Sequence, residues 1–385
     1  MDSKTASTSN PPHGETILKT IAIFAILYLF LVSIGMIGSA FKGMGKEFAV
    51  QLIQSNAGPL IGLFIGILAT SIIQSSSTTT SLVVGMVAAG TFGDDFRIAV
   101  AAAVPYIMGA NIGTSITNLI VSLGYIVNKN EFRRAFSASI VHDFFNVMSV
   151  LILFPMEMAF GLISKSASWL AELLVGSESF SFNSPIKLIT DPAVAWVKEL
   201  FKQQEIINYN WLLLIVAFLL LFLSLRYLSK LIRSLVIHKL EAFFDSHIFK
   251  TAGRAMLFGV FITILVQSSS ITTSLVVPLA GAGILRLEQI FPYTLGANIG
   301  TTITALLASL VSGTIAPLAV AFSHLIFNIF GIAIIWPIER VRNIPIITAK
   351  WFTEIAIQNK IYPIIYILVV FFIQLLLNDL KRYVS

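Results

Sequence analysis

One stretch of polar side chains occurs twice in this otherwise apolar chain. The sequence QSSSTTTSLVV at 74–84 returns as QSSSITTSLVV at 267–277, with ten of eleven residues identical. The amide and hydroxyl oxygens form a neutral set that suits sodium better than calcium, which normally collects carboxylates. If a helix begins near Thr78, residues 75–77 lie at its N-terminus, where free N–H groups and the helix dipole favour an anion. The same motif can therefore serve cations and an anion.

Two further polar patterns are duplicated in the same order. Gly-Ala-Asn-Ile-Gly-Thr stands at 109–114 and 296–301, and a His-x-x-x-Asn pair stands at 142–146 and 324–328. A single serine-rich or Gly-x-x-x-Gly patch in a membrane helix is more often helix packing than a ligand site. Two complete copies in register favour two halves of one binding site.

Asp143 is the one carboxylate deep inside an apolar segment. An ionisable group at that depth is a functional candidate by default, and its alternative is a structural pair with a nearby donor. His142 and His324 fit a proton site or hydrogen bonds between packed helices. Because the repeated patches contain no Arg or Lys, an anion would depend on hydroxyls, helix ends and bound cations. Cation binding would then have to precede anion binding.

The composition indicates a membrane protein rather than a soluble one. The chain has 385 residues, 56% of them hydrophobic and 11% charged, whereas a soluble domain carries about 25% charge. Several apolar runs reach the roughly 20 residues that cross a bilayer. Cysteine is absent, which excludes disulfides and thiolate chemistry. The net charge is +6. The basic residues that produce it lie between apolar segments, so they indicate positive-inside loops rather than nucleic-acid binding.

The chain divides into two similar membrane units. Each arm beside a QSSS tip has about 15 residues, too few to cross alone, so we expect re-entrant hairpins whose tips line a cavity. The expected units are a disordered tail at 1–14, repeat 1 at 15–163 with its hairpin at about 57–90, an extramembrane linker at 164–206, repeat 2 at 207–340 with its hairpin at about 250–283, and an interfacial segment with a C-terminal transmembrane helix at 341–385.

Counting crossings predicts inverted halves. Each half has three crossings, which are expected at 17–37, 97–126 and 135–163, and at 210–225, 286–312 and 315–338. Three is odd, so the halves run in opposite directions, and the basic loops then share the cytoplasmic side with the N-terminus. The predicted fold is an all-α polytopic membrane protein with two inverted-topology repeats and a C-terminal helix. Each repeat holds a re-entrant hairpin and a helix broken at its Gly-Ala-Asn-Ile-Gly-Thr segment, as in secondary transporters.

These motifs resemble the type II sodium–phosphate cotransporter family over roughly residues 57–160 and 250–340. The resemblance rests on both QSSS segments, MGANIGTSITN at 108–118, RRAF at 133–136, VHDFFN at 141–146 and TLGANIGTTIT at 294–304. It implies a sodium-coupled symporter, not an enzyme, that imports inorganic phosphate. Sodium would be co-transported through the lipid bilayer, and neither an organic cofactor nor a nucleic-acid partner is expected.

The resemblance also implies the site residues. Phosphate would bind the hydroxyls of Ser75, Ser76, Ser77, Ser268, Ser269 and Ser270. Sodium would bind near Gln74, Asn111, Thr114, Asp143, Asn146, Gln267, Asn298, Thr301, Thr304 and Asn328.

Departures from the family pattern refine this expectation. Animal members carry a long disulfide-bearing outer loop, and this chain has no cysteine and a short linker, which favours a bacterial member in the inner membrane. Ala297 replaces a serine found in many animal members. Electrogenic members carry Asp at position 143, whereas Ser137 and Ser139 resemble the electroneutral pattern. We expect electrogenic transport because a carboxylate offers a direct extra sodium ligand.

Three alternatives remain open. The hydroxyl cage does not by shape exclude another small oxyanion such as sulfate or arsenate. An ion channel also uses polar re-entrant tips, but it usually builds its filter from several chains. An intramembrane enzyme would need a nucleophile and a base, for which His142, Asp143 and a nearby serine are the candidates.

Overall fold

The computed structural model is helical throughout the parts of the chain that it describes. The described residues are 17–26, 28–29, 32–33, 36, 39–40, 58–88, 92–93, 95–173, 185–202, 209–236, 248–266, 268–312 and 315–384. The tail predicted at 1–14 lies outside them, and the crossing predicted at 17–37 is described only in part.

Two sets of helices follow one another in the same order. The first set is α2 (Pro59–Ile73), α3 (Ser76–Ala88), α4 (Phe96–Gly113), α5 (Ile116–Leu123), α6 (Lys129–Phe160) and α7 (Leu162–Glu172). The second set is α11 (Ala252–Val266), α12 (Ser269–Gly281), α13 (Leu287–Ser312), α14 (Ile315–Ile335) and α15 (Glu339–Gln358). The helices α8 (Pro185–Lys202), α9 (Tyr209–Val236) and α16 (Ile361–Val384) lie outside these sets.

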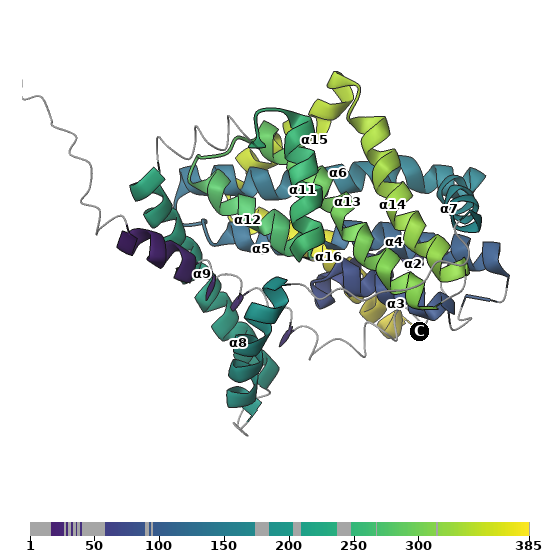
Figure 1. The fold of residues 1–385 in the computed structure, drawn as a ribbon, viewed down its shortest axis with the longest axis horizontal. Coiled ribbons are helices and arrows are strands. Elements are labelled where there is room, and N and C mark those ends of the chain that lie inside the picture. Colours follow the sequence, from purple (N-terminus) through teal and green to yellow (C-terminus); the bar gives the residue numbers. More distant parts are fainter. Residues whose placement is uncertain are drawn as a thin grey trace, which may run out of the picture.

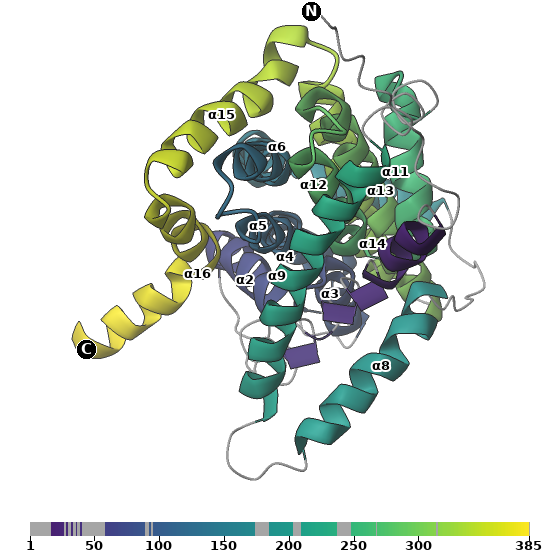
Figure 2. The ribbon, with the colours of Figure 1, turned by 90° about the vertical axis from the view of Figure 1, so that its left-hand side faces the viewer.

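The two sets pack in equivalent ways. Helix α2 packs along α4, and α11 packs along α13 in the same manner. Between the sets, α6 packs against α15 while α14 packs against α7. Figure 2 shows α4, α5 and α6 nearly end-on in the centre, with α15 and α16 on one side and α8 on the other. This arrangement is consistent with the predicted repeat, and the opposite membrane orientation of its halves stays a prediction.

The first hairpin has the predicted form of two helices joined at the QSSS tip. Pro59 opens α2, a position where its missing N–H costs nothing. The helix ends at Gln74, which has φ 58° and is the one non-glycine residue with positive φ in the described part of the chain. Its Nε2 donates to the Ser71 carbonyl at 2.8 Å, and its own N–H donates to Thr70 O at 2.7 Å. These bonds hold a backbone conformation that costs about 1–2 kcal/mol for a side chain with a Cβ.

Serine caps begin the second arm of both hairpins. Ser75 Oγ accepts the N–H of Thr78 at 3.2 Å, and Ser268 Oγ accepts the N–H of Ile271 at 3.3 Å. Both hydroxyls thereby satisfy one of the orphan N–H groups at a helix start. The prediction that the serines stand at helix N-termini is confirmed. Gln267 lies outside the described residues.

The broken helix is confirmed in the first half and wrong in the second. Helix α4 ends at Gly113 and α5 begins at Ile116, with a tightened turn in which Ser115 N donates to Ile112 O at 3.1 Å. In the second half α13 runs without interruption through 296–301.

The physical reason is that the glycines of this motif allow close packing rather than helix interruption. A Cβ on Gly109 would collide with the carbonyl oxygen of Leu63, and one on Gly296 with that of Met256. The missing side chains let α4 lie directly on the backbone of α2, and α13 on that of α11. The glycine pattern therefore reports contact between helices, and a break does not follow from it.

Three helical segments of the described chain, one of them formed by α4 together with α5, are long and apolar enough to cross a membrane. They span Phe96–Leu123, Lys129–Phe160 and Ile315–Ile335, and they make this a multi-pass membrane protein. Helices α9, α13 and α16 have 28, 26 and 24 residues, which at 1.5 Å per residue also reaches across about 30 Å. Their crossing stays a prediction.

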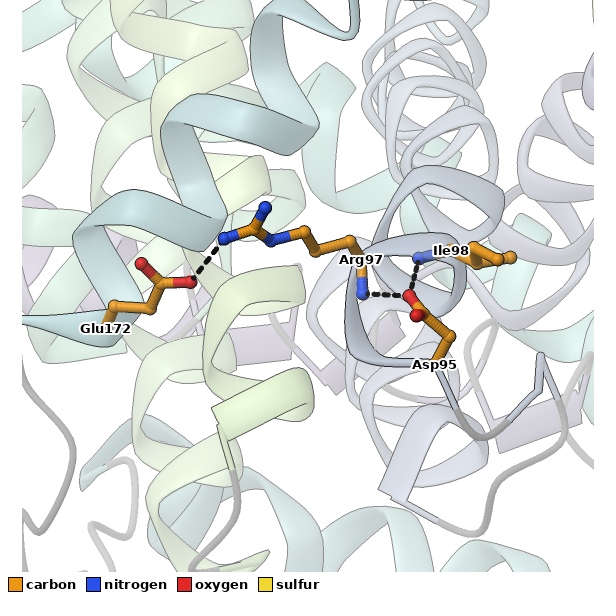
Figure 3. Close-up of polar contacts among 4 residues, drawn as sticks. All are labelled: Asp95, Arg97, Ile98 and Glu172. Carbon is orange, nitrogen blue, oxygen red and sulfur yellow. Dashed lines mark hydrogen bonds and ion pairs between the residues drawn. The ribbon is translucent and has the colours of Figure 1, made fainter.

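Ion pairs join equivalent helices at two places. Asp95 caps α4 by accepting the N–H groups of Arg97 and Ile98 at 2.9 Å each, and the Arg97 guanidinium reaches Glu172 of α7 at 3.4 Å (Figure 3). In the second half, Lys350 of α15 pairs with Glu288 of α13 at 2.7 Å. One ion pair thus connects α4 with α7, and the other connects the equivalent helices α13 and α15. The basic residue lies on α4 in the first half and on α15 in the second. Figure 1 shows α7 and α15 near different ends of α6.

Candidate functional site

Residues predicted from the two halves meet in one hydrogen-bonded network. His142 Nε2 lies 2.6 Å from Asn298 Oδ1, joining α6 to α13. Asn298 Nδ2 donates in turn to Asn146 Oδ1 at 2.8 Å. His142 Nε2 also lies 3.3 Å from Asn146 Nδ2, so this nitrogen contacts both asparagines. The first half's His/Asn pair therefore reaches the asparagine of the second half.

The reverse connection is also present. His324 Nε2 lies 3.3 Å from Asn111 Oδ1, and Asn328 Nδ2 donates to the same oxygen at 3.3 Å. The two networks join where Asn146 Nδ2 donates to the Asn111 carbonyl at 3.0 Å. Four predicted sodium residues are thus brought together from four helices: Asn111, Asn146, Asn298 and Asn328.

The network is buried and formed by neutral side chains. Asn146 is 0% exposed and Asn298 3%, and Asn328 Oδ1 has no hydrogen-bond partner among the described residues. Burying a polar oxygen without a partner costs free energy. A small cation that accepts amide oxygens as ligands would remove this cost, and sodium is such a cation.

Four serine hydroxyls at the hairpin tips are left free by the fold. Ser76, Ser269 and Ser270 are 3% exposed, and Ser77 is 8% exposed. Within the described part of the chain none of these four side chains has a hydrogen-bond partner. They stand in the first turns of α3 and α12, where backbone N–H groups also lack intrahelical acceptors. Two buried donor sets of this kind suit a small oxyanion.

Helix α5 connects both hairpins through two consecutive residues. Thr117 Oγ1 donates to Gln74 Oε1 at 2.6 Å. Asn118 Oδ1 accepts the hydroxyls of Thr273 at 2.9 Å and Ser274 at 3.0 Å. Helix α5 thus contacts the end of α2 in the first hairpin and the start of α12 in the second.

The sequence analysis missed Thr117 and Asn118. Thr117 is the repeat equivalent of Thr304, which was predicted, so aligning the halves residue by residue would have found it. Asn118 corresponds to Ala305, and the repeat therefore carries no signal for it.

The predicted threonines are placed less directly. Thr114 Oγ1 donates to Ala110 O, and Thr301 Oγ1 donates to Ala297 O, both at 2.9 Å. These bonds stay within each helix and use the hydroxyl proton, so both lone pairs of each oxygen are left for a ligand. Thr304 is half-buried.

Asp143 lies apart from the amide network but is connected to it. The carboxylate is fully buried, and its Oδ2 accepts the hydroxyl of Tyr366 from α16. The Ser115 side chain is within reach of the same carboxylate, and Asn146 Nδ2 donates to Ser115 Oγ at 3.4 Å. Oδ1 has no partner among the described residues. Tyr366 could not be predicted from the repeat, because α16 has no counterpart in it.

Two pockets open at opposite ends of α6. One, of about 810 Å³, is lined by Arg97, Glu157 and Trp169. The other, of about 380 Å³, is lined by Arg133, Arg134 and further charged side chains. Neither of these two pockets is lined by a predicted phosphate or sodium residue.

Long apolar helices around a duplicated polar core define the class of this protein, a helical membrane transport protein. A model of the Na+/Pi-cotransporter family matches residues 29–177 and 220–342. The chain belongs to this family, which is one of transporters and not of enzymes.

Curated relatives agree with this assignment. The chain is 31% identical to sodium-dependent phosphate transport protein 2A of Rattus norvegicus over 93% of its own length and 67% of the relative. It is 32% identical to sodium-dependent phosphate transport protein 2B of Homo sapiens over 92% of its length and 64% of the relative. The chain thus spans about two thirds of the length of these relatives. No solved structure matches it.

Proposed function

We propose that this protein is a sodium-coupled symporter that imports inorganic phosphate by alternating access. The observation that carries the proposal is a set of four buried serines at two helix N-termini whose hydroxyls have no hydrogen-bond partner among the described residues. These termini are tied through α5 to an amide network built from both halves. The relatives, which are named sodium-dependent phosphate transport proteins, agree with it.

Charge explains why transport would require sodium. Moving an unpaired anion into a buried site is strongly unfavourable, and the hairpin tips and the amide network contain no Arg or Lys. Sodium ions held by amide, hydroxyl and carboxylate oxygens would supply the compensating positive charge. Phosphate would therefore bind well only after sodium, and this order couples the two solutes.

Asp143 supports electrogenic transport. If three sodium ions accompany one divalent phosphate, one net positive charge enters per cycle. The membrane potential would then contribute about 2.3 kcal/mol per 100 mV to each cycle. The free Oδ1 of the buried carboxylate suits the sodium ion that carries this charge.

Alternating access is supported by the burial of the site residues. The serines and asparagines are buried, so substrate can reach them only after the helices move. Inverted repeats let one half open toward each side in turn. We further propose a bacterial inner-membrane location with a cytoplasmic N-terminus.

The test is uptake of labelled phosphate into proteoliposomes containing the purified protein. An inward sodium gradient is expected to drive accumulation, and an equal potassium gradient is not. Parallel samples contain excess unlabelled phosphate, sulfate or arsenate. If sulfate or arsenate suppresses the labelled uptake more than unlabelled phosphate does, that oxyanion is the better substrate. Uptake that ignores the sodium gradient would refute the symport, and release of phosphate from added esters would indicate an enzyme.

A further inference from the structure

The C-terminal helix α16 reaches Asp143, the most deeply buried carboxylate among the described residues. Tyr366, near the start of this helix, donates its hydroxyl to Asp143 Oδ2. The helix lies outside the two repeats and outside the residues that the family model matches, which end at 342. A segment that is not part of the duplicated unit thus contacts a residue inside it.

Aromatic packing fixes the ring of Tyr366. Its centroid lies 5.0 Å from that of Phe352 in α15 and 6.0 Å from that of Phe144 in α6. Phe371, one turn further along α16, packs edge-on against it at 6.5 Å. Rings held on three sides leave little rotational freedom. The position of the hydroxyl is therefore set by packing as well as by its hydrogen bond.

The carboxylate itself has two unlike oxygens. Oδ2 accepts the Tyr366 hydroxyl, and the Ser115 side chain is within reach of the carboxylate. Oδ1 has no hydrogen-bond partner among the described residues. The ion pairs found in the described chain join other residues. A buried carboxylate that is held at one oxygen and open at the other presents the open oxygen in one fixed direction.

We propose that Tyr366 is a positioning residue for the transported sodium ion that binds Asp143. Its hydroxyl holds Oδ2 and stabilises the charged carboxylate, so that Oδ1 faces the cation. This makes α16 a part of the cation site rather than a membrane anchor alone. The inference rests on the proposed sodium-coupled function and assigns a further residue to it.

The central test is Tyr366→Phe, which keeps the ring and removes the hydroxyl. We expect the half-saturating sodium concentration for phosphate uptake to rise about tenfold, since a hydrogen bond to a charged group is lost. Maximal uptake and the half-saturating phosphate concentration at saturating sodium should change less than about twofold. A merely structural role would lower maximal uptake instead.

Tyr362→Phe is the matched control. Tyr362 lies one turn earlier on α16 with its side chain 43% exposed. Removing its hydroxyl should leave sodium activation unchanged. An equal shift in this control would show that the effect belongs to the helix and not to the contact with Asp143.

A double-mutant cycle with Asp143→Asn separates positioning from general destabilisation. Sodium-dependent thermal stabilisation of the purified protein provides a readout that needs no turnover. Tyr366→Phe should reduce it in the wild-type background and have no further effect in Asp143→Asn, because the two changes remove one interaction. Additive effects in the cycle would overturn the proposal.

A second variant covers the case in which Tyr366→Phe does not fold. Phe352→Leu keeps the hydroxyl but removes the ring that packs closest to it, and we expect half-saturating sodium to rise about two- to threefold. Unchanged sodium activation in the folded variants would overturn the role of Tyr366 while leaving the symport intact. Absence of sodium-driven uptake in the wild type would instead refute the proposed function.

Discussion

His142 of α6 and Asn298 of α13 lie 2.6 Å apart, Nε2 to Oδ1, and join the two halves of the chain. The equivalent contact, between His324 and Asn111, measures 3.3 Å. Each half therefore supplies the histidine for the other half's asparagine. It follows that the polar core forms only when both halves pack together, and that a substitution in one half removes a hydrogen-bond partner from the other half.

Asn298→Ala tests this dependence. The variant leaves His142 Nε2 and Asn146 Oδ1 without their partner, and each buried unsatisfied group costs about 1–3 kcal/mol. We expect a lower apparent melting temperature in detergent and at least about a tenfold rise in half-saturating sodium. Thr294→Ala on the same helix is the control, because its buried hydroxyl bonds only to Phe291 O. Equal sodium activation in the two variants would argue that the network is structural.

Removing the free hydroxyls at the hairpin tips should weaken phosphate binding. Ser76→Ala and Ser269→Ala each delete one proposed donor, which we expect to raise the half-saturating phosphate concentration about five- to thirtyfold. Folding should be little affected, since neither side chain has a partner within the described structure. The control is Ser71→Ala, whose hydroxyl bonds to Ile67 O in its own helix. Phosphate dependence that stays the same in both tip variants contradicts the proposed anion site.

Closely packed glycines should tolerate no side chain. A Cβ on Gly109 would collide with Leu63 O, whereas one on Gly253 would meet nothing within 4 Å. Gly109→Ala should therefore reduce stability by about 1–3 kcal/mol, the range for overpacked cores. Gly253→Ala should be neutral or slightly stabilising. Melting temperatures measured side by side decide this, and a stable Gly109→Ala would show that α2 and α4 can move apart freely.

Asp143→Gly should separate charge movement from phosphate uptake. Removing the carboxylate deletes one proposed sodium ligand, so we expect the transport current to vanish while some sodium-dependent uptake remains. Solid-supported-membrane recordings and labelled uptake on the same proteoliposomes measure both quantities. A current that persists at the wild-type charge per phosphate would exclude Asp143 from the electrogenic step.

The sequence alone was sufficient for the local features of the site. In a bilayer the backbone N–H and C=O groups of a long apolar run can be hydrogen-bonded within the segment only if it forms a helix. The repeated QSSS segments identified the serines at the starts of α3 and α12. The duplicated Asn and His residues likewise identified the side chains that meet in the core. Aligning the repeats more finely would have added Thr117. The same pattern also misled, since the glycines at 296–301 were taken as a break and instead serve contact with α11.

The tertiary structure decided which polar side chains form hydrogen bonds within the protein and which remain available to a ligand. The motif spacing placed the serines at helix starts but did not show which of them act as caps. Ser75 and Ser268 accept a backbone N–H, whereas the hydroxyls of Ser76 and Ser269 have no partner among the described residues. Motif spacing also carries no information on Tyr366, which lies 223 residues from Asp143 in the chain and has no repeat partner. Side-chain types at a given spacing follow from sequence, but contacts between distant helices follow only from how their surfaces pack.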